Sequence, residues 1–295
     1  MGRIDRSDYL SAVEEALGRY VPEPPLMQAE LFRAMRYSLF AGGKRIRPTL
    51  VLEFCGLCGG DQEAALPFAC AVEMIHTYSL IHDDLPCMDD DGMRRGKPSN
   101  HVVFGEAQAL LAGDSLLTAA FETMLSSESV GKVGAQRAAD AAGVLAAAAG
   151  AYGMAGGQAI DLMSEGKRIP VETLRKMDEC KTGALIRAAA KMGCILAGAE
   201  SSLVRAADGY AAAVGLAFQI VDDILDVQGN EKALGKPVGS DRDNGKSTYV
   251  SLLGPESARR SVRELTAAAV SSLGAFRGDT EYLRALAENL AKRDR

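Results

Sequence analysis

The chain has 295 residues, of which 47% are hydrophobic and 24% are charged, and its formal net charge is −6. This composition is typical of a soluble globular protein, and the length allows one large domain or two small ones. An acidic chain lacks the broad basic surface that nucleic acid or an anionic membrane requires, so any anionic substrate has to be held by local cations.

No segment predicts export or membrane insertion. The first eight residues are rich in charge and lack an apolar signal core. The longest uncharged run, residues 141–160, reaches the length of a membrane span, but alanine and glycine contribute little transfer energy and no aromatic belt frames the run. We expect it to form a buried helix. The six cysteines lie mostly among apolar residues, which favours reduced thiols and a cytoplasmic protein.

The N-terminal part of the chain predicts helices joined by a short cationic turn. Apolar residues recur at helical spacing in two segments, residues 5–20 and 27–41. Two glycines end the second segment, and Lys44, Arg45 and Arg47 follow just before Pro48, which can open the next helix. A solvated turn explains these charges as well as an anion site does.

Helical periodicity continues over residues 49–58 and 62–82, and the chain then becomes crowded with charge. Five aspartates come directly before three cations: Asp83, Asp84, Asp89, Asp90 and Asp91, then Arg94, Arg95 and Lys97. Carboxylates this close repel one another unless a cation lies among them, and hard oxygen ligands suit Mg²⁺ or Mn²⁺. The arginines would be misplaced beside a bare metal ion but fit a metal-bound phosphate. An acidic surface loop is the alternative interpretation.

The rest of the chain also predicts helices. Residues 106–125 show helical periodicity, and later alanine-rich segments alternate with breaks at residues 166–170, 198–202 and 229–245, without an alternating strand pattern. Lys181 and Thr182 form a polar island after the helical residues 171–180. Residues 235–246 carry Lys236 and Lys246 between glycines, as expected of a lid over phosphates, although a plain loop also explains them.

A second acidic group lies on a predicted helix. Gln219, Asp222, Asp223 and Asp226 recur at i, i+3, i+4 and i+7, which places them on one stripe of a helix whose other faces are apolar. Three buried aspartates without a purpose would be costly. We therefore expect one all-α domain over residues 1–295, a helical bundle around a deep central cavity that both acidic groups face, forming a multi-metal clamp.

Five motifs occur in the order and form known from one enzyme family. They are Gly-Gly-Lys-Arg-Ile-Arg-Pro at 42–48, the aspartates followed by Arg-Arg-Gly-Lys-Pro at 94–98, Lys-Thr-Gly at 181–183, Phe-Gln-Ile-Val-Asp-Asp-Ile-Leu-Asp at 218–226 and Gly-Lys-Pro-Val-Gly-Ser-Asp at 235–241. With them the chain resembles the trans-isoprenyl diphosphate synthases, and within that family the bacterial farnesyl diphosphate synthases. The resemblance implies an all-α isoprenoid synthase fold, usually a homodimer, that uses three Mg²⁺ ions, with Mn²⁺ as a substitute.

The resemblance also implies roles for particular residues. The metal would be held by Asp83, Asp84, Asp89, Asp222, Asp223 and Asp226. The allylic diphosphate would be bound by Arg94, Lys181, Gln219 and Lys236, with Lys246 acting from the lid and Thr182 near the developing cation. Isopentenyl diphosphate would be bound by Lys44, Arg47, His76 and Arg95. Catalysis would depend above all on Lys181, Thr182, Gln219, Asp83 and Asp222.

The third metal ligand of the first motif stays open. On an unbroken helix Asp83 and Asp89 would point in nearly opposite directions, because six residues turn about 600°. Pro86 should bend the segment, so we follow the family in choosing Asp89, whereas a regular helix favours Asp90, and Asp91 also stays possible.

The expected reaction joins dimethylallyl or geranyl diphosphate to isopentenyl diphosphate by ionisation, condensation and proton elimination, giving (2E,6E)-farnesyl diphosphate. The resemblance implies that Tyr78, five positions before Asp83, stops growth at fifteen carbons, with Ser79 beside it; an ordinary core aromatic is the alternative interpretation of Tyr78. The alternatives are a geranylgeranyl diphosphate synthase and a non-catalytic regulatory subunit. A terpene cyclase would have no use for Lys44 and Arg47, and an acidic Ca²⁺-binding module none for Arg94.

Overall fold

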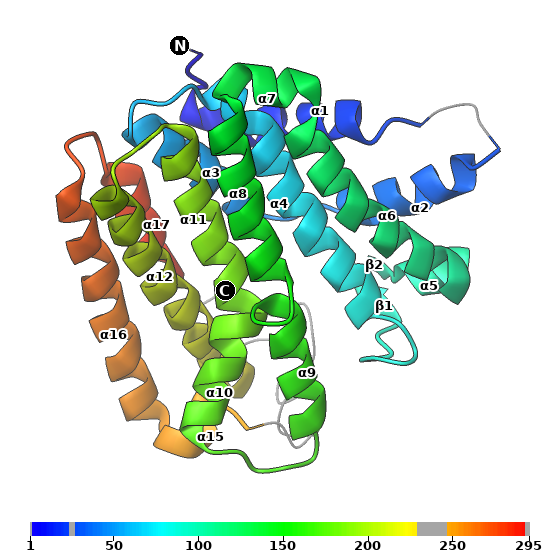
Figure 1. The fold of residues 1–295 in the computed structure, drawn as a ribbon. Helices are drawn as coiled ribbons and strands as arrows, with labels where there is room; N and C mark the ends of the chain where they lie inside the picture. Colours follow the sequence, from blue (N-terminus) through cyan, green and yellow to red (C-terminus); the bar gives the residue numbers. More distant parts are fainter. Residues whose placement is uncertain (1, 24–26, 229–246, 293–295) are drawn as a thin grey trace. The chain divides into compact units, whose positions relative to one another are not determined.

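Figure 1 shows the chain as a computed structural model, in which residues 2–23, 27–228 and 247–292 are described. The described residues are almost entirely helical, so the prediction of an all-α protein is confirmed. Contacts within the chain define two compact units. Unit 1 comprises Met1–Gly143 and Ile195–Gly198, and unit 2 comprises Val144–Cys194 and Ala199–Arg295. A single domain over residues 1–295 and a central cavity stay predictions.

Unit 1 is built around one long apolar helix. Its described helices are η1 (Arg6–Asp8), α1 (Tyr9–Tyr20), α2 (Ala29–Leu39), α3 (Ile46–Leu57), α4 (Gln62–Asp83), α5 (Asn100–Phe104), α6 (Glu106–Leu125), α7 (Ser127–Val133) and most of α8 (Ala135–Ala149). The Asp61 side chain caps α4 by accepting a hydrogen bond from Ala64 N at 3.1 Å. The helix then runs between α3 and α6 with almost all its apolar side chains buried (Figure 1). Its C-terminal end therefore holds the acidic motif on a rigid element.

Unit 2 contains the second acidic group. Its described elements are α9 (Met154–Ser164), α10 (Val171–Asp178), the wide π-type turn η2 (Glu179–Gly183), most of α11 (Ala184–Leu196), α12 (Ser201–Gln228), α15 (Tyr249–Leu253), α16 (Pro255–Ser272), η3 (Leu273–Ala275) and α17 (Glu281–Ala291). Helix α12 lies alongside α16 (Figure 1). Leu216, Ile220 and Leu225 of α12 pack in a buried apolar cluster with Tyr249 and Val262. This packing fixes the rotation of α12 about its axis.

One local feature differs from the sequence predictions. Two-residue strands, β1 (Met93–Arg94) and β2 (Lys97–Pro98), pair antiparallel, and segments this short carry no periodicity that a sequence could reveal. Helix α3 begins at Ile46, so Pro48 lies in its first turn as expected. The Lys-Thr-Gly island lies within a continuous helical stretch, because α10, η2 and α11 follow one another without a break.

Residues 141–160 do not form one buried helix as expected. The run breaks between α8 and α9, where a Cβ atom on Gly153 would lie 2.1 Å from the Ala148 carbonyl oxygen, so only glycine fits. Ala146 and Ala147 on α8 are exposed. Two described segments, Gln62–Asp83 and Ala135–Ser164, are long and apolar enough to cross a membrane by length and composition, a test that core helices of soluble proteins also pass.

Candidate active site

The first acidic motif lies where α4 ends. Asp83 is the last residue of the helix, and the chain turns back so that Asp89 N donates a hydrogen bond to the Asp83 carbonyl oxygen at 2.9 Å. Asp90 follows in a left-handed conformation with φ of 50° and is exposed. The helix does not continue past this point, so the regular-helix argument for Asp90 does not apply. The choice of Asp89 as a ligand stays a prediction.

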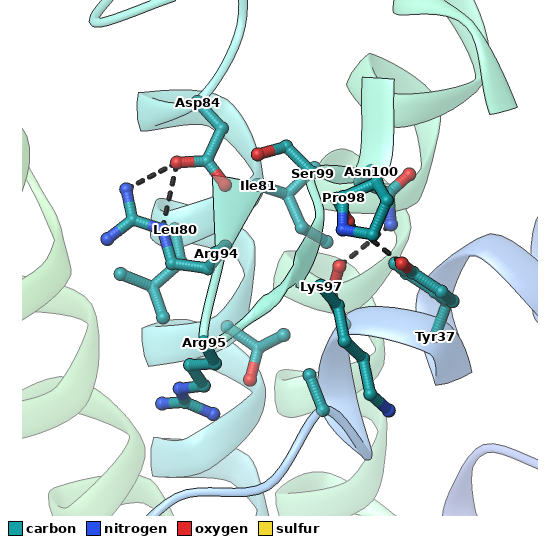
Figure 2. A pocket seen from close by; sticks show the side chains of 13 residues that line it. Tyr37, Leu80, Ile81, Asp84, Arg94, Arg95, Lys97, Pro98, Ser99 and Asn100 are labelled. Carbon is teal, nitrogen blue, oxygen red and sulfur yellow. Dashed lines mark hydrogen bonds and ion pairs between the residues drawn. The ribbon is translucent and has the colours of Figure 1, made fainter. Parts of the chain in front are cut away.

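Asp84 is buried and already has a cationic partner. Its Oδ1 atom accepts hydrogen bonds from Arg94 Nε at 2.9 Å and from Arg94 Nη2 (Figure 2). Arg94 Nη2 also lies 3.3 Å from Asp91 Oδ2. Burial raises the pKa of Asp84, while Arg94 acts in the opposite direction. Arg94 reaches this position from the β1–β2 hairpin, whose turn has positive φ at Arg95 and Gly96. The hairpin thus brings the Arg94 guanidinium onto the end of α4.

A group of cations lies near the middle of α4. Arg95 Nη1 donates to the Gly42 carbonyl oxygen, which joins the hairpin to the Gly42–Arg47 turn. Burial, followed by the guanidinium groups of Arg47 and Arg95, holds the pKa of His76 well below its usual range. His76 is therefore a neutral imidazole among positive charges. Unit 1 accordingly brings together three of the four residues predicted to bind isopentenyl diphosphate, and the fourth, Lys44, is exposed in the same turn.

Arg47 is the member of this group that most needs an anion. Its Nε atom is buried and has no hydrogen-bond partner among the described residues. Burial lowers the pKa of Arg47, Glu73 raises it and Arg95 lowers it. A guanidinium that stays charged under these conditions is stabilised by a bound anion.

The residues predicted to limit product length lie on the last turns of α4. Tyr78 is half-buried, and its ring meets the His82 ring edge-on with centroids 5.7 Å apart. Burial raises the pKa of Tyr78. Ser79 Oγ donates to the His76 carbonyl oxygen at 2.9 Å, so this hydroxyl is bonded within its own helix.

In unit 2 the polar stripe forms on α12 as predicted. Gln219, Asp222 and Asp223 are half-buried and Asp226 is 2% exposed. Asp223 Oδ2 accepts a hydrogen bond from Tyr249 N at 2.7 Å, which connects α12 to the start of α15. The stripe therefore consists of one amide and three carboxylates set in an otherwise apolar part of α12.

The wide turn η2 carries Lys181 and Thr182 next to α9. Lys181 Nζ lies 2.6 Å from Asp161 Oδ2, and Thr182 is half-buried. A Cβ atom on Gly157 of α9 would lie 2.2 Å from Lys181 N, so there is no room for a side chain there, whereas a Cβ atom on Gly215 of α12 would lie at an ordinary contact distance of 3.5 Å from Gly183 Cα. Wide helical turns of this kind often occur at functional sites because they redirect backbone groups and side chains. Lys236 and Lys246 lie outside the described residues.

Four residues of unit 2 near this turn were not predicted. They are Gln158, Asp161, Asp178 and Tyr249. Burial raises the pKa of Asp178 to about 7, the Tyr249 hydroxyl opposes this rise, and Asp161 adds to it. Gln158 is 8% exposed, and neither polar atom of its amide has a partner among the described residues. A polar pair at i and i+3 in an otherwise mostly apolar helix, Gln158 and Asp161, was the available sequence signal.

The residues predicted to bind metal are carboxylates. Mg²⁺ is usually bound by one or two carboxylates together with substrate phosphates and water. Asp83 and Asp89 of unit 1 and Asp222 of unit 2 are half-buried. Among the described residues no group of three or more histidine, cysteine or acidic side chains is assembled to chelate an ion. The metal-binding role of these aspartates stays a prediction.

Comparisons with known proteins show which family the chain belongs to. The polyprenyl synthetase family matches residues 28–281. Farnesyl diphosphate synthase of Geobacillus stearothermophilus is 47% identical over 287 residues, covering 96% of this chain and 95% of that protein. Farnesyl diphosphate synthase of Escherichia coli is 45% identical, covering 95% of each. Geranylgeranyl pyrophosphate synthase 11 of Arabidopsis thaliana is also 47% identical, covering 96% of this chain and 79% of that protein.

Solved structures show the same likeness. An FPP/GFPP synthase from Zymomonas mobilis matches with a TM-score of 0.86 at 36% identity, covering 97% of this chain and 98% of that one. Geranylgeranyl pyrophosphate synthetase from Pyrococcus horikoshii matches with a TM-score of 0.88 at 32% identity, covering 96% of each. The fold is therefore the all-α isoprenoid synthase type, and the similarity supports a prenyltransferase activity for the chain. The chain belongs to the polyprenyl synthetase family.

Proposed function

We propose that the protein is a (2E,6E)-farnesyl diphosphate synthase, which condenses dimethylallyl or geranyl diphosphate with isopentenyl diphosphate. One observation supports this proposal: within unit 1, the cation group around His76 and the acidic group at Asp83 lie along the same helix, α4. His76, beside Arg47 and Arg95, lies seven residues before Asp83, which is about 10 Å along a helix at 1.5 Å per residue. A cation group and an acidic group this far apart suit two separate diphosphates.

The acidic residues are proposed to serve the leaving diphosphate through Mg²⁺. The proposed ligands are Asp83, Asp84, Asp89, Asp222, Asp223 and Asp226. When bound, Mg²⁺ neutralises the negative charge that grows on the leaving diphosphate. We propose three Mg²⁺ ions, the number used in the related family, and Mn²⁺ as a substitute. Asp84 would have to exchange Arg94 for the metal, which releases this guanidinium toward the phosphate oxygens.

The chain's own residues then ionise the allylic substrate. Arg94, Lys181 and Gln219 hold the departing diphosphate, because charge-assisted hydrogen bonds strengthen as charge develops on its oxygens. Thr182, whose place in η2 is fixed by the surrounding helix, offers oxygen atoms to the allylic cation. Lys236 and Lys246 are proposed to assist from a segment that closes over the site and excludes water.

The second substrate is held by the group on α4 and its neighbours. Arg47, Arg95 and Lys44 bind the isopentenyl diphosphate, and His76 contributes a neutral hydrogen-bonding imidazole. The double bond of this substrate attacks the allylic cation, and the resulting cation loses a proton to the released diphosphate. Every charged intermediate is thereby consumed before water enters.

Product length separates farnesyl from geranylgeranyl diphosphate synthesis. Relatives named for either product are about equally similar to this chain, at 47% identity in each case, so identity does not discriminate between them. Tyr78 supports the shorter product, because a half-buried aromatic ring five residues before the first aspartate occupies the space that a longer chain needs. We also propose a homodimer in the cytoplasm; a non-catalytic subunit would have lost aspartates, and both motifs here are complete.

The test is incubation of the protein with Mg²⁺, labelled isopentenyl diphosphate and either dimethylallyl, geranyl or farnesyl diphosphate, followed by measurement of product carbon number. We expect fifteen-carbon product from the first two primers. Tyr78→Ala should shift the product to twenty carbons or more, with Tyr78→Phe as the control that keeps the ring.

Asp83→Asn and Asp222→Asn should each reduce turnover by a factor on the order of 10³ while helical content stays unchanged. Normal turnover in both variants would exclude the proposed role of the carboxylates.

A further inference from the structure

The turn that carries Lys44 and Arg47 has an uncommon backbone conformation. Gly42 and Gly43 have φ values of 92° and 134°, and Arg45 has φ of 49° and ψ of 37°, in the left-handed region. Glycine adopts such values freely, whereas a residue with a Cβ atom does so only where its surroundings hold it there. Arg45 is therefore the residue in this turn whose conformation has to be enforced.

Contacts of the Arg45 side chain hold the turn in this conformation. It is 3% exposed, and its Nη1 atom lies 2.6 Å from Oε1 of Glu73, which is itself 2% exposed. Its Nη2 atom donates to the Leu39 carbonyl oxygen at 2.6 Å and lies 3.4 Å from Glu14 Oε1. One guanidinium thus fastens the turn to α4, to the end of α2 and to α1. Such a buried, forked set of contacts is specific to arginine.

Three predicted ligands of isopentenyl diphosphate depend on this turn. Lys44 directly precedes Arg45, and Arg47 lies two residues later in the first turn of α3, whose early bond runs from Thr49 N to the Arg45 carbonyl oxygen at 3.0 Å. Arg95 contacts the same turn, because its Nη1 atom donates to the Gly42 carbonyl oxygen. A change in the turn would therefore move all three cations together.

Glu73 connects the turn to the remaining ligand. It lies one helical turn before His76 on the same side of α4. Burial lowers the pKa of the Arg47 and Arg95 guanidinium groups, and the Glu73 carboxylate opposes this lowering at both. Glu73 is thus a buried carboxylate that interacts with three cations of this part of the chain, Arg45, Arg47 and Arg95.

We propose that Arg45 and Glu73 are positioning residues for isopentenyl diphosphate: their buried ion pair holds the left-handed turn that places Lys44, Arg47 and Arg95. Neither residue needs to touch the substrate. The inference rests on the proposed function, because it assumes that these cations bind isopentenyl diphosphate. It predicts a selective defect, in which binding of this substrate weakens while use of the allylic substrate is unchanged.

A simpler role for Glu73 makes the opposite prediction. If Glu73 only offset nearby positive charge, its removal would leave a more cationic site, and isopentenyl diphosphate would bind more tightly. If it positions the turn, the same removal weakens binding. Glu73→Asp distinguishes the effect of the negative charge from the effect of the contact with Arg45. It keeps the carboxylate but shortens the side chain by one methylene, which withdraws the carboxylate from Arg45.

The experiment measures steady-state kinetics of Arg45→Lys, Glu73→Asp and Glu73→Gln with geranyl and isopentenyl diphosphate, each varied in turn. We expect the KM for isopentenyl diphosphate to rise about 10- to 100-fold in all three variants, as displacement of a binding group by about 1 Å would cause. The KM for geranyl diphosphate and the kcat should change less than about threefold. Lysine at position 45 keeps the charge but cannot reach Glu73 and Leu39 together.

The matched control is a second buried ion pair in unit 1. Arg6 Nε lies 2.8 Å from Oε1 of Glu53, which is 3% exposed and belongs to α3, the helix that the turn opens. Arg6→Lys loosens the same helix without altering the turn, so it should leave both KM values unchanged. Far-UV circular dichroism at the assay temperature verifies that each variant is folded. Should Arg45→Lys be unfolded, the two Glu73 variants decide the question.

Each outcome has one meaning. If the unaltered protein fails to join the two substrates, the proposed function is wrong, and the variants need not be measured. If the unaltered protein is active and the Arg45 and Glu73 variants keep a normal KM for isopentenyl diphosphate, or lower it, the positioning role is wrong. An equal rise in both KM values, or the same rise in Arg6→Lys, also overturns it, because the pair would then support only general stability.

Discussion

Gly157→Ala should weaken both the fold and catalysis, because the space beside Gly157 is already filled by backbone. A Cβ atom at this position would lie 2.2 Å from Lys181 N and 2.6 Å from Lys181 Cα. Ordinary carbon contacts begin near 3.4 Å, so α9 would have to move away from η2 by about 1 Å. Neither helix can relieve the clash by rotating a side chain.

The expected magnitude follows from two opposing effects. Overpacking of this kind costs about 3 kcal/mol of unfolding free energy, at the upper end of its usual range because both partners are backbone. Replacing a helical glycine with alanine returns about 1 kcal/mol. The net loss of stability should therefore be about 2 kcal/mol. A shift of about 1 Å at Lys181 and Thr182 should also reduce turnover about 100-fold.

The assay combines urea unfolding, followed by far-UV circular dichroism, with turnover measurement. Gly143→Ala is the matched control, since Gly143 lies within α8 and a Cβ atom there would meet nothing within 4 Å. This variant should be stabilised by about 0.5–1 kcal/mol and fully active. Equal urea midpoints and equal turnover for Gly157→Ala and the unaltered protein would refute the close contact between α9 and η2.

The remaining predictions concern buried polar groups. Asp178 has a pKa raised from 3.8 to about 7, chiefly by burial, so the folded chain retains a proton that the unfolded chain releases, and this contribution to stability is lost as pH rises through 7. Asp178→Asn should therefore raise the urea midpoint at pH 8 and leave it unchanged near pH 4 in metal-free buffer; no gain at pH 8 would contradict this. Tyr210 Oη donates to the Leu283 carbonyl oxygen at 2.7 Å in a fully buried position. Tyr210→Phe should cost about 1–2 kcal/mol by urea unfolding, and an unchanged midpoint would show that the bond contributes nothing.

Local patterns predicted the helical elements well. Residues 62–82 were expected to form a helix and α4 spans Gln62–Asp83, while residues 106–125 coincide with α6 (Glu106–Leu125). The prediction was correct for these two segments because their apolar residues recur at helical spacing and face the core on most sides of the helix. The prediction of one buried helix for residues 141–160 was wrong, because composition alone did not show the break at Gly153. There the close approach of the Ala148 carbonyl oxygen decides the backbone conformation.

In the candidate site, too, spacing within one helix could be predicted from the sequence, whereas contacts beyond the helix could not. Carboxylates at i, i+3, i+4 and i+7 define a stripe wherever a helix forms, so Asp222, Asp223 and Asp226 could be placed on one face from spacing alone. The end of α4 could not be treated in this way, because the turn that brings Asp89 N within 2.9 Å of the Asp83 carbonyl oxygen depends on contacts beyond the helix.

The sequence by itself determined the all-α class, the two acidic groups and the identity of the cations, because each depends on residue type and on spacing within one helix or motif. Only the tertiary structure decided which of these charges have partners. It joins Arg45 to Glu73 and Lys181 to Asp161, pairs separated by 28 and 20 residues. Such contacts arise when separate helices pack together, and no local periodicity encodes which side chains meet there.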